Sequence, residues 1–104
     1  MLTVLAIYPT TPSGRFDMDY YLNQHMPMLV KISGPLLFSA TIDQGLAGIV
    51  PGSPAANHII ARLVFESQET LDAFFAQHAA TLMADIPNFT DIEPVLQISQ
   101  VLYS

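Results

Sequence analysis

The sequence contains no cysteine and has only three basic residues, Arg15, Lys31 and Arg62. Without cysteine, disulfides, thiolate nucleophiles and cysteine-bound zinc or iron–sulfur clusters are all excluded. Nine acidic residues leave the chain with a formal net charge of −6. So acidic a chain lacks the basic surface on which nucleic acids and anionic membranes bind, and neither is expected as a partner.

Long hydrophobic runs and a secretory leader are also missing. No apolar stretch reaches the roughly 18 residues of a membrane span, and residues 1–9 have neither a basic start nor a small-residue cleavage site. A cytoplasmic location is therefore expected. Apolar residues are abundant, because 51% of the 104 residues are hydrophobic and only 12% are charged. We expect a single domain over residues 1–104, with apolar surface left over for an oligomer or a ligand pocket.

The hydrophobic pattern predicts four strands and two helices in the order βαββαβ. The expected strands cover residues 2–8, 36–44, 58–66 and 95–103, and the expected helices cover residues 18–32 and 68–83. Asp17 and Ser67 provide N-cap signals, and Pro27 predicts a kink near His25. Residues 85–94 are expected to form an acidic turn. This order is typical of the ferredoxin-like α+β fold, in which both helices cover one face of a four-stranded antiparallel sheet.

The other face of that sheet is also expected to be partly apolar. The first strand is apolar on both sides, and Ile60 and Val64 point away from the helices by alternation. A sheet with one face in water would alternate more cleanly. The sequence therefore predicts a homodimer through the sheet faces, with an interface of roughly 2,000 Å² or more. Arg62 is expected on this face, where it pairs with an acid of the partner or, as the less favoured reading, binds an anion.

Two histidines fall within the apolar faces of the two expected helices. His25 shares its arc with residues such as Tyr21, Leu22 and Leu29, and His78 lies among Leu71, Phe74, Phe75 and Leu82. Each ring is either a hydrogen-bonded core residue or, in an apolar cavity, a neutral general base near pH 7. Tyr21 is either a core aromatic or a donor to a substrate oxygen. His25, His78 and Tyr21 are the predicted catalytic residues.

Other motifs are absent. No two histidines have the spacing of metal ligands on one element, and neither a P-loop nor a G-x-S-x-G motif occurs. We therefore expect no metal and no cofactor. Haem binding through His25 or His78 is kept as an alternative.

Two segments resemble a known family. Residues 17–27 read DMDYYLNQHMP, which resembles the D-x-x-Y-Y-x-x-x-H-x-P signature of the EthD family, and residues 85–99, DIPNFTDIEPVLQIS, are similar to the family's ending. The resemblance implies a dimeric α+β barrel in which two ferredoxin-like sheets face each other. It also makes His25 the best candidate for chemistry. The family is named after ethyl tert-butyl ether degradation, and its barrel is shared by cofactor-free monooxygenases, polyketide cyclases, lactone isomerases and haem-degrading proteins.

Two functions of different classes remain open. The first is a cofactor-free catabolic enzyme for a small hydrophobic metabolite, such as a cyclic ketone, a lactone or an aromatic intermediate. In that enzyme His25 moves a proton while His78 or Tyr21 polarises an oxygen. The second is a non-catalytic binding or accessory protein that carries a hydrophobic intermediate for an oxygenase. A wholly apolar pocket, with both histidines bonded to backbone carbonyls, would favour the second function.

Overall fold

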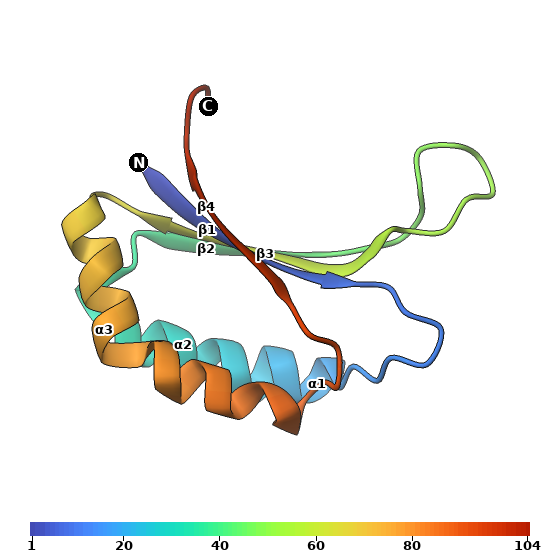
Figure 1. Cartoon of the computed structure of the whole chain (residues 1–104), viewed down its shortest axis with the longest axis horizontal. Coiled ribbons are helices and arrows are strands. Elements are labelled where there is room, and N and C mark those ends of the chain that lie inside the picture. The colour runs from blue at the N-terminus through green and yellow to red at the C-terminus, as the bar shows by residue number, and fades with distance from the viewer.

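Four strands form one antiparallel sheet, and the helices cover one of its faces (Figure 1). The structure is a computed structural model that describes the whole chain, residues 1–104. The strands are β1 (Leu2–Pro9), β2 (Ser39–Gln44), β3 (Asn57–Phe65) and β4 (Val95–Gln100). Their order across the sheet is β2-β3-β1-β4, and every neighbouring pair is antiparallel. The predicted ferredoxin-like α+β fold is therefore confirmed.

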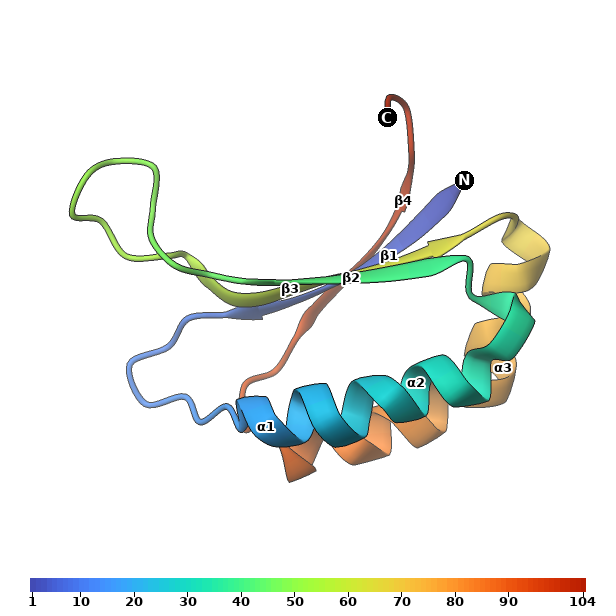
Figure 2. The same cartoon turned by 180° about the vertical axis from the view of Figure 1, so that it is seen from behind.

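Two helical segments lie side by side beneath the sheet (Figure 2). The first runs without a break from α1 (Met18–Tyr20) through the π-helix η1 (Tyr21–His25) to α2 (Met26–Ser33), and it ends in the 3-10 turn η2 (Gly34–Leu36). The second is α3 (Gln68–Asp85), which is followed by the 3-10 turn η3 (Ile86–Asn88). None of these helices combines the length and the apolar character that crossing a membrane requires.

The predicted capping residues occupy the helix ends. The carboxylate of Asp17 accepts a hydrogen bond of 3.0 Å from the backbone N–H of Tyr20. Ser67 and Thr70 form a reciprocal capping box at the start of α3. Gly34 is the C-cap of α2. Its φ of 51° is a left-handed conformation that glycine adopts at little cost. These local signals fix where the helices begin and where the first one stops.

Three predicted boundaries are wrong by two or three residues. α3 continues to Asp85, so this residue ends the helix instead of opening an acidic turn. β2 begins at Ser39, because residues 34–36 form η2 instead of extending the strand. β4 ends at Gln100, and residues 101–104 continue beyond the sheet without regular structure. The position of Asp85 is the difference that matters for the site.

The irregularity predicted near His25 takes the form of a π-helix. Pro27 has no N–H and cannot donate to the carbonyl of Asn23. Instead, the N–H of Met26 donates to the carbonyl of Tyr21, five residues earlier. A π-helical turn contains more residues than an α-helical turn, so it changes which side chains face the core. Both Tyr21 and His25 are buried within η1.

Alternation along β3 separates the two faces of the sheet as predicted. Its odd-numbered residues from Ile59 to Phe65 are buried against the helices, whereas Ile60 and Val64 are half-buried on the other face. Val64 lies opposite Thr3 of β1 and Ser39 of β2. The core therefore lies between the sheet and the helices, and the second sheet face carries apolar side chains that no helix of this chain covers.

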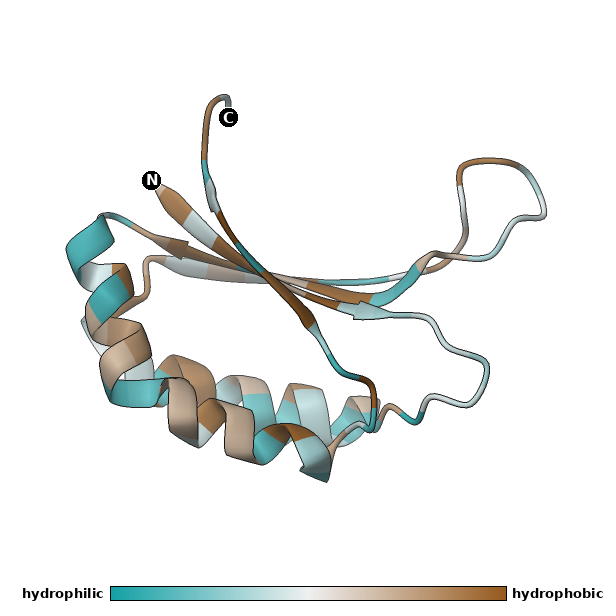
Figure 3. Cartoon of the chain, viewed as in Figure 1, coloured by the Kyte–Doolittle hydropathy of each residue, from teal (hydrophilic) through white to brown (hydrophobic).

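Apolar side chains also project at both ends of the sheet. The loop of residues 45–56 extends from β2 and β3 away from the helices, and the C-terminal segment bends toward the same side (Figures 1 and 3). The loop carries three largely exposed residues, Leu46, Ile49 and Val50, and the C-terminal segment carries Leu102 and Tyr103. Together with the second sheet face, these segments form an uncovered and partly apolar surface.

Candidate functional site

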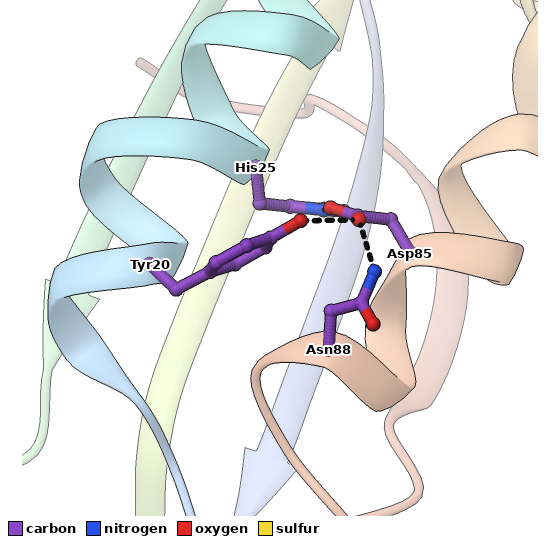
Figure 4. Close-up of polar contacts among 4 residues, drawn as sticks. All are labelled: Tyr20, His25, Asp85 and Asn88. Atoms are coloured by element: carbon purple, nitrogen blue, oxygen red, sulfur yellow. Dashed lines mark hydrogen bonds and ion pairs between the residues drawn. The ribbon is translucent and has the colours of Figure 1, made fainter.

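His25 pairs with Asp85 across the space between the two helical segments (Figure 4). The Nδ1 atom of His25 is 2.9 Å from Oδ2 of Asp85. The two side chains are only 6% and 14% exposed, respectively. His25 is the last residue of η1 and Asp85 is the last residue of α3, so the π-helix and the long helix together bring the two groups into contact.

Asp85 is held by two further donors (Figure 4). The hydroxyl of Tyr20 donates to Oδ1 at 2.7 Å, and Nδ2 of Asn88 donates to the same oxygen at 2.9 Å. Burial raises the pKa of Asp85, but the hydrogen bonds from Asn88, Tyr20 and His25 together outweigh it, so the pKa lies below its ordinary value. The hydrogen bond that the Tyr20 hydroxyl donates to Asp85 also raises the pKa of that hydroxyl. Asp85 is therefore an anion at neutral pH.

An ionised Asp85 determines the tautomer of His25. A carboxylate only accepts hydrogen bonds, so Nδ1 of His25 carries a proton, and in the neutral ring the lone pair is on Nε2. Nε2 has no hydrogen-bond partner in the chain, and no polar side-chain atom of the structure is both sealed from solvent and unpaired. Nε2 therefore reaches open space. This is the geometry of an imidazole that can accept a proton while a carboxylate stabilises the resulting cation.

His25 lies in the wall of a cavity of about 80 Å³ between the sheet and the helices. Twelve of the thirteen lining residues are hydrophobic, and His25 is the exception. Two lining residues, Met83 of α3 and Leu96 of β4, are 50% and 49% exposed, so the cavity opens between these elements. A cavity that holds benzene measures about 150 Å³, so this one accepts only a ligand smaller than benzene and has no room for haem.

A larger hollow of about 490 Å³ lies on the opposite face of the sheet. It is lined by eight residues, among them Thr3, Leu5 and Arg62. Arg62 is exposed and forms no ion pair within the chain. We assign the candidate site to the smaller cavity, because of these two hollows only the smaller one has an imidazole in an apolar wall.

The structure brings Tyr21 to His25. The two rings stack with centroids 5.6 Å apart and planes inclined by 14°. Burial, and to a lesser extent the nearby Tyr8, raises the pKa of Tyr21 above its ordinary value. Tyr21 does not line the cavity. It packs against the catalytic candidate and holds the orientation of that ring.

The structure does not bring His78 to the same place. Its ring lies 6.2 Å from that of Phe74, is only half-buried and does not line the cavity. The expectation that His25 and His78 converge on one space is therefore not met. His78 lies on the predicted stripe of α3, but its place along the helix is too far toward the N-terminus to reach His25, which meets the last turn.

Sequence reasoning missed Tyr20, Asp85 and Asn88. One physical signal could have revealed Asp85: an acid at a helix C-terminus is unfavourable, because the helix dipole is negative there. An acid in that position needs donors, and Asn88 lies three residues further on, within one turn. Tyr20 lies in the same segment as His25, but its partner is 65 residues away. Pairing at that separation cannot be inferred from periodicity.

No group of three histidine, aspartate or glutamate side chains lies close enough together to hold a metal ion. The polar site is thus built from one imidazole, one carboxylate, one phenol and one amide.

Comparison with known proteins gives one family. The EthD domain family matches residues 13–93. No curated protein matches the chain. The crystal structure of an EthD-like protein from Ralstonia eutropha JMP134 is similar, with 39% sequence identity over 98% of this chain and 92% of that chain, and a TM-score of 0.90.

Two more distant structures share the fold. An EthD family protein from Bacillus halodurans C-125 has 17% identity over 98% of this chain and 99% of its own, with a TM-score of 0.69. An antibiotic biosynthesis monooxygenase has 16% identity over 99% of this chain and 100% of its own, with a TM-score of 0.54. At these identities the likeness concerns the fold alone.

Proposed function

The chain belongs to the EthD family, and from that premise we propose that it acts on a small hydrophobic metabolite by cofactor-free proton transfer at His25. One observation carries the proposal: Nδ1 of His25 is held at 2.9 Å by Asp85, while the same ring lines an apolar cavity. An imidazole fixed in this way is the arrangement that general-base catalysis uses.

In the proposed reaction, Nε2 takes a proton from a carbon next to a carbonyl group. The electron pair of the broken C–H bond moves toward the carbonyl oxygen, and His25 becomes an imidazolium beside the anionic Asp85. Return of the proton to another carbon isomerises the molecule. The same carbanion can instead close a ring or react with oxygen, so reactions of the isomerase, cyclase and monooxygenase types share this first step.

The alternative is a non-catalytic binding or accessory protein for an oxygenase system. Its support is the hydrophobic character of twelve of the thirteen cavity residues. In such a protein the His25–Asp85 pair would have only a structural role. The two functions differ in one measurable respect, because binding alone does not accelerate proton exchange.

Deuterium exchange distinguishes the proton-transfer enzyme from the non-catalytic binding protein. The unmodified protein is incubated with acetone or butanone, which are smaller than benzene, in D₂O, and exchange of the hydrogens next to the carbonyl is followed by NMR. We expect acceleration that His25→Gln lowers by about a hundredfold or more. His58→Gln is the matched control, because His58 packs against Phe16 with ring centroids 5.0 Å apart and does not line the cavity. Binding without accelerated exchange in the unmodified protein would favour the binding protein.

We further propose that the chain forms a homodimer through the second face of its sheet. The support is the set of half-buried and exposed apolar side chains on that face and at its ends, which no helix of the chain covers. Arg62 lies on this face without an ion-pair partner in the chain, and the proposed partner supplies its acid.

A further inference from the structure

Tyr8 lies in the wall of the same cavity as His25. It belongs to β1, faces the helices and is only 3% exposed. Its hydroxyl makes no hydrogen bond in the chain, yet no polar side-chain atom is both sealed and unpaired. The Tyr8 oxygen therefore keeps a small accessible surface. Of the two hollows described above, only the cavity beside His25 includes Tyr8 in its wall.

We propose that the Tyr8 hydroxyl is the hydrogen-bond donor to the substrate oxygen, so that the cavity selects neutral apolar carbonyl compounds. This inference rests on the proposed function of His25 and adds its substrate class. The sequence alone pointed to Tyr21 or His78 for this role, but neither of them lines the cavity.

Packing holds the Tyr8 ring in place. It makes edge contacts with Phe16, Phe89 and Tyr21, at centroid distances of 5.4, 5.9 and 6.2 Å. His25 packs on the same Phe89 ring at 4.6 Å. The proposed donor and the proposed base are thus oriented by one shared aromatic cluster. A donor fixed before the reaction stabilises developing negative charge without reorganisation.

The state of the hydroxyl agrees with this role. Burial raises the pKa of Tyr8 to about 12, so the phenol keeps its proton throughout the neutral range. In the proton-transfer step, Nε2 of His25 takes the proton and the carbonyl oxygen gains the electron pair. Tyr8 then donates a hydrogen bond to that oxygen without giving up its proton. The charge created is one imidazolium and one enolate, and both are discharged when the proton returns.

The composition of the wall defines the ligand class. Apart from His25 and the Tyr8 hydroxyl, the lining offers only hydrophobic side chains, and it includes no lysine or arginine. A carboxylate or phosphate would enter without a countercharge, at a large desolvation cost. A neutral molecule with one acceptor oxygen and an apolar body matches this lining. The Tyr8 hydroxyl is the donor to its oxygen, Nε2 of His25 has the lone pair that takes its proton, and the apolar wall contacts its body.

A pair of ligands of nearly equal shape tests the donor. Acetone and isobutene differ in an oxygen against a CH₂ group, and their dissociation constants can be measured by NMR titration. We expect the unmodified protein to prefer the ketone by about threefold to tenfold, the value of one neutral hydrogen bond. Tyr8→Phe should abolish that preference, whereas Tyr103→Phe, on a residue that is 96% exposed and does not line the cavity, should keep it. Both variants retain an aromatic ring and remove a hydroxyl without a hydrogen bond, so we expect both to fold.

The outcomes separate this inference from the function on which it rests. A preference that survives Tyr8→Phe, or that is lost equally in Tyr103→Phe, would overturn the inference even if His25 still catalyses exchange. Equal binding of the two ligands by the unmodified protein would overturn it as well. Conversely, a Tyr8-dependent preference in a protein that does not accelerate deuterium exchange would support the carbonyl site and contradict the proposed catalysis.

Discussion

Asp85 stands where its charge is least favourable on its own helix. The last carbonyls of α3 present a partial negative charge, which repels a carboxylate at that end. Three donors compensate: the side chains of Tyr20, His25 and Asn88. A residue placed against its local preference and then fully satisfied by distant partners is typical of functional sites. The sequence predicted an acidic turn from Asp85 onward, whereas Asp85 is the last residue of α3.

The lowered pKa of Asp85 predicts a pH dependence of stability. Its folded-state pKa lies below the unfolded value of about 3.9, so its contribution is present above about pH 4 and is lost as the pH falls through the folded-state pKa. We expect Asp85→Asn to flatten the dependence of the melting temperature on pH below about pH 4. Thermal melts followed by circular dichroism between about pH 2 and 7 measure this. Asp72→Asn, an exposed site on the same helix, should leave the slope unchanged.

At the scale of elements, local chemistry predicted most of the fold. Asp17, Ser67 and Gly34 mark helix ends by capping and turn preferences that act within a few residues, and strand alternation follows from pleat geometry. The π-helix was predicted only as a kink, because proline removes one bond without specifying which alternative bond forms. The sequence predicted a buried histidine in each helix. It could not predict which residues of the other helix each ring meets, because that depends on how the helices pack.

The capping box of α3 gives a test at this scale. Ser67→Ala removes the acceptor for the backbone N–H of Thr70, a contact of 3.2 Å, and should lower the free energy of unfolding by about 1 kcal/mol. Ser67→Asp keeps an acceptor at the N-cap and should restore most of the loss. Urea denaturation curves measure both variants. Equal stability of Ser67→Ala and the unmodified protein would show that tertiary packing alone determines the start of α3.

At the scale of the whole molecule, the two faces of the sheet differ in what they contact. One face and the helices enclose the His25 cavity, while the other carries Ile60, Val64 and Arg62 toward solvent. The loop tip and the C-terminal segment extend from the ends of that second face, away from the helices (Figure 1). Contiguous exposed apolar surface is typical of interaction sites, which is why we propose that this face forms the dimer. Pairing of two second faces would cover it and leave both cavities free.

Val64 tests this pairing. It lies on the second face near the end of β3, opposite Thr3 and Ser39 on the neighbouring strands. In a two-fold dimer an aspartate at this position would replace an apolar side chain in both copies and bury two carboxylates at a desolvation cost. We expect Val64→Asp to convert a dimer into a monomer or to unfold the protein, as measured by light scattering and thermal melts. Val30→Asp places the same charge on an exposed site of α2 and should leave the dimer intact. An unmodified protein that is monomeric at micromolar concentration would contradict the proposed dimer. So would a dimeric Val64→Asp variant with an unchanged melting temperature.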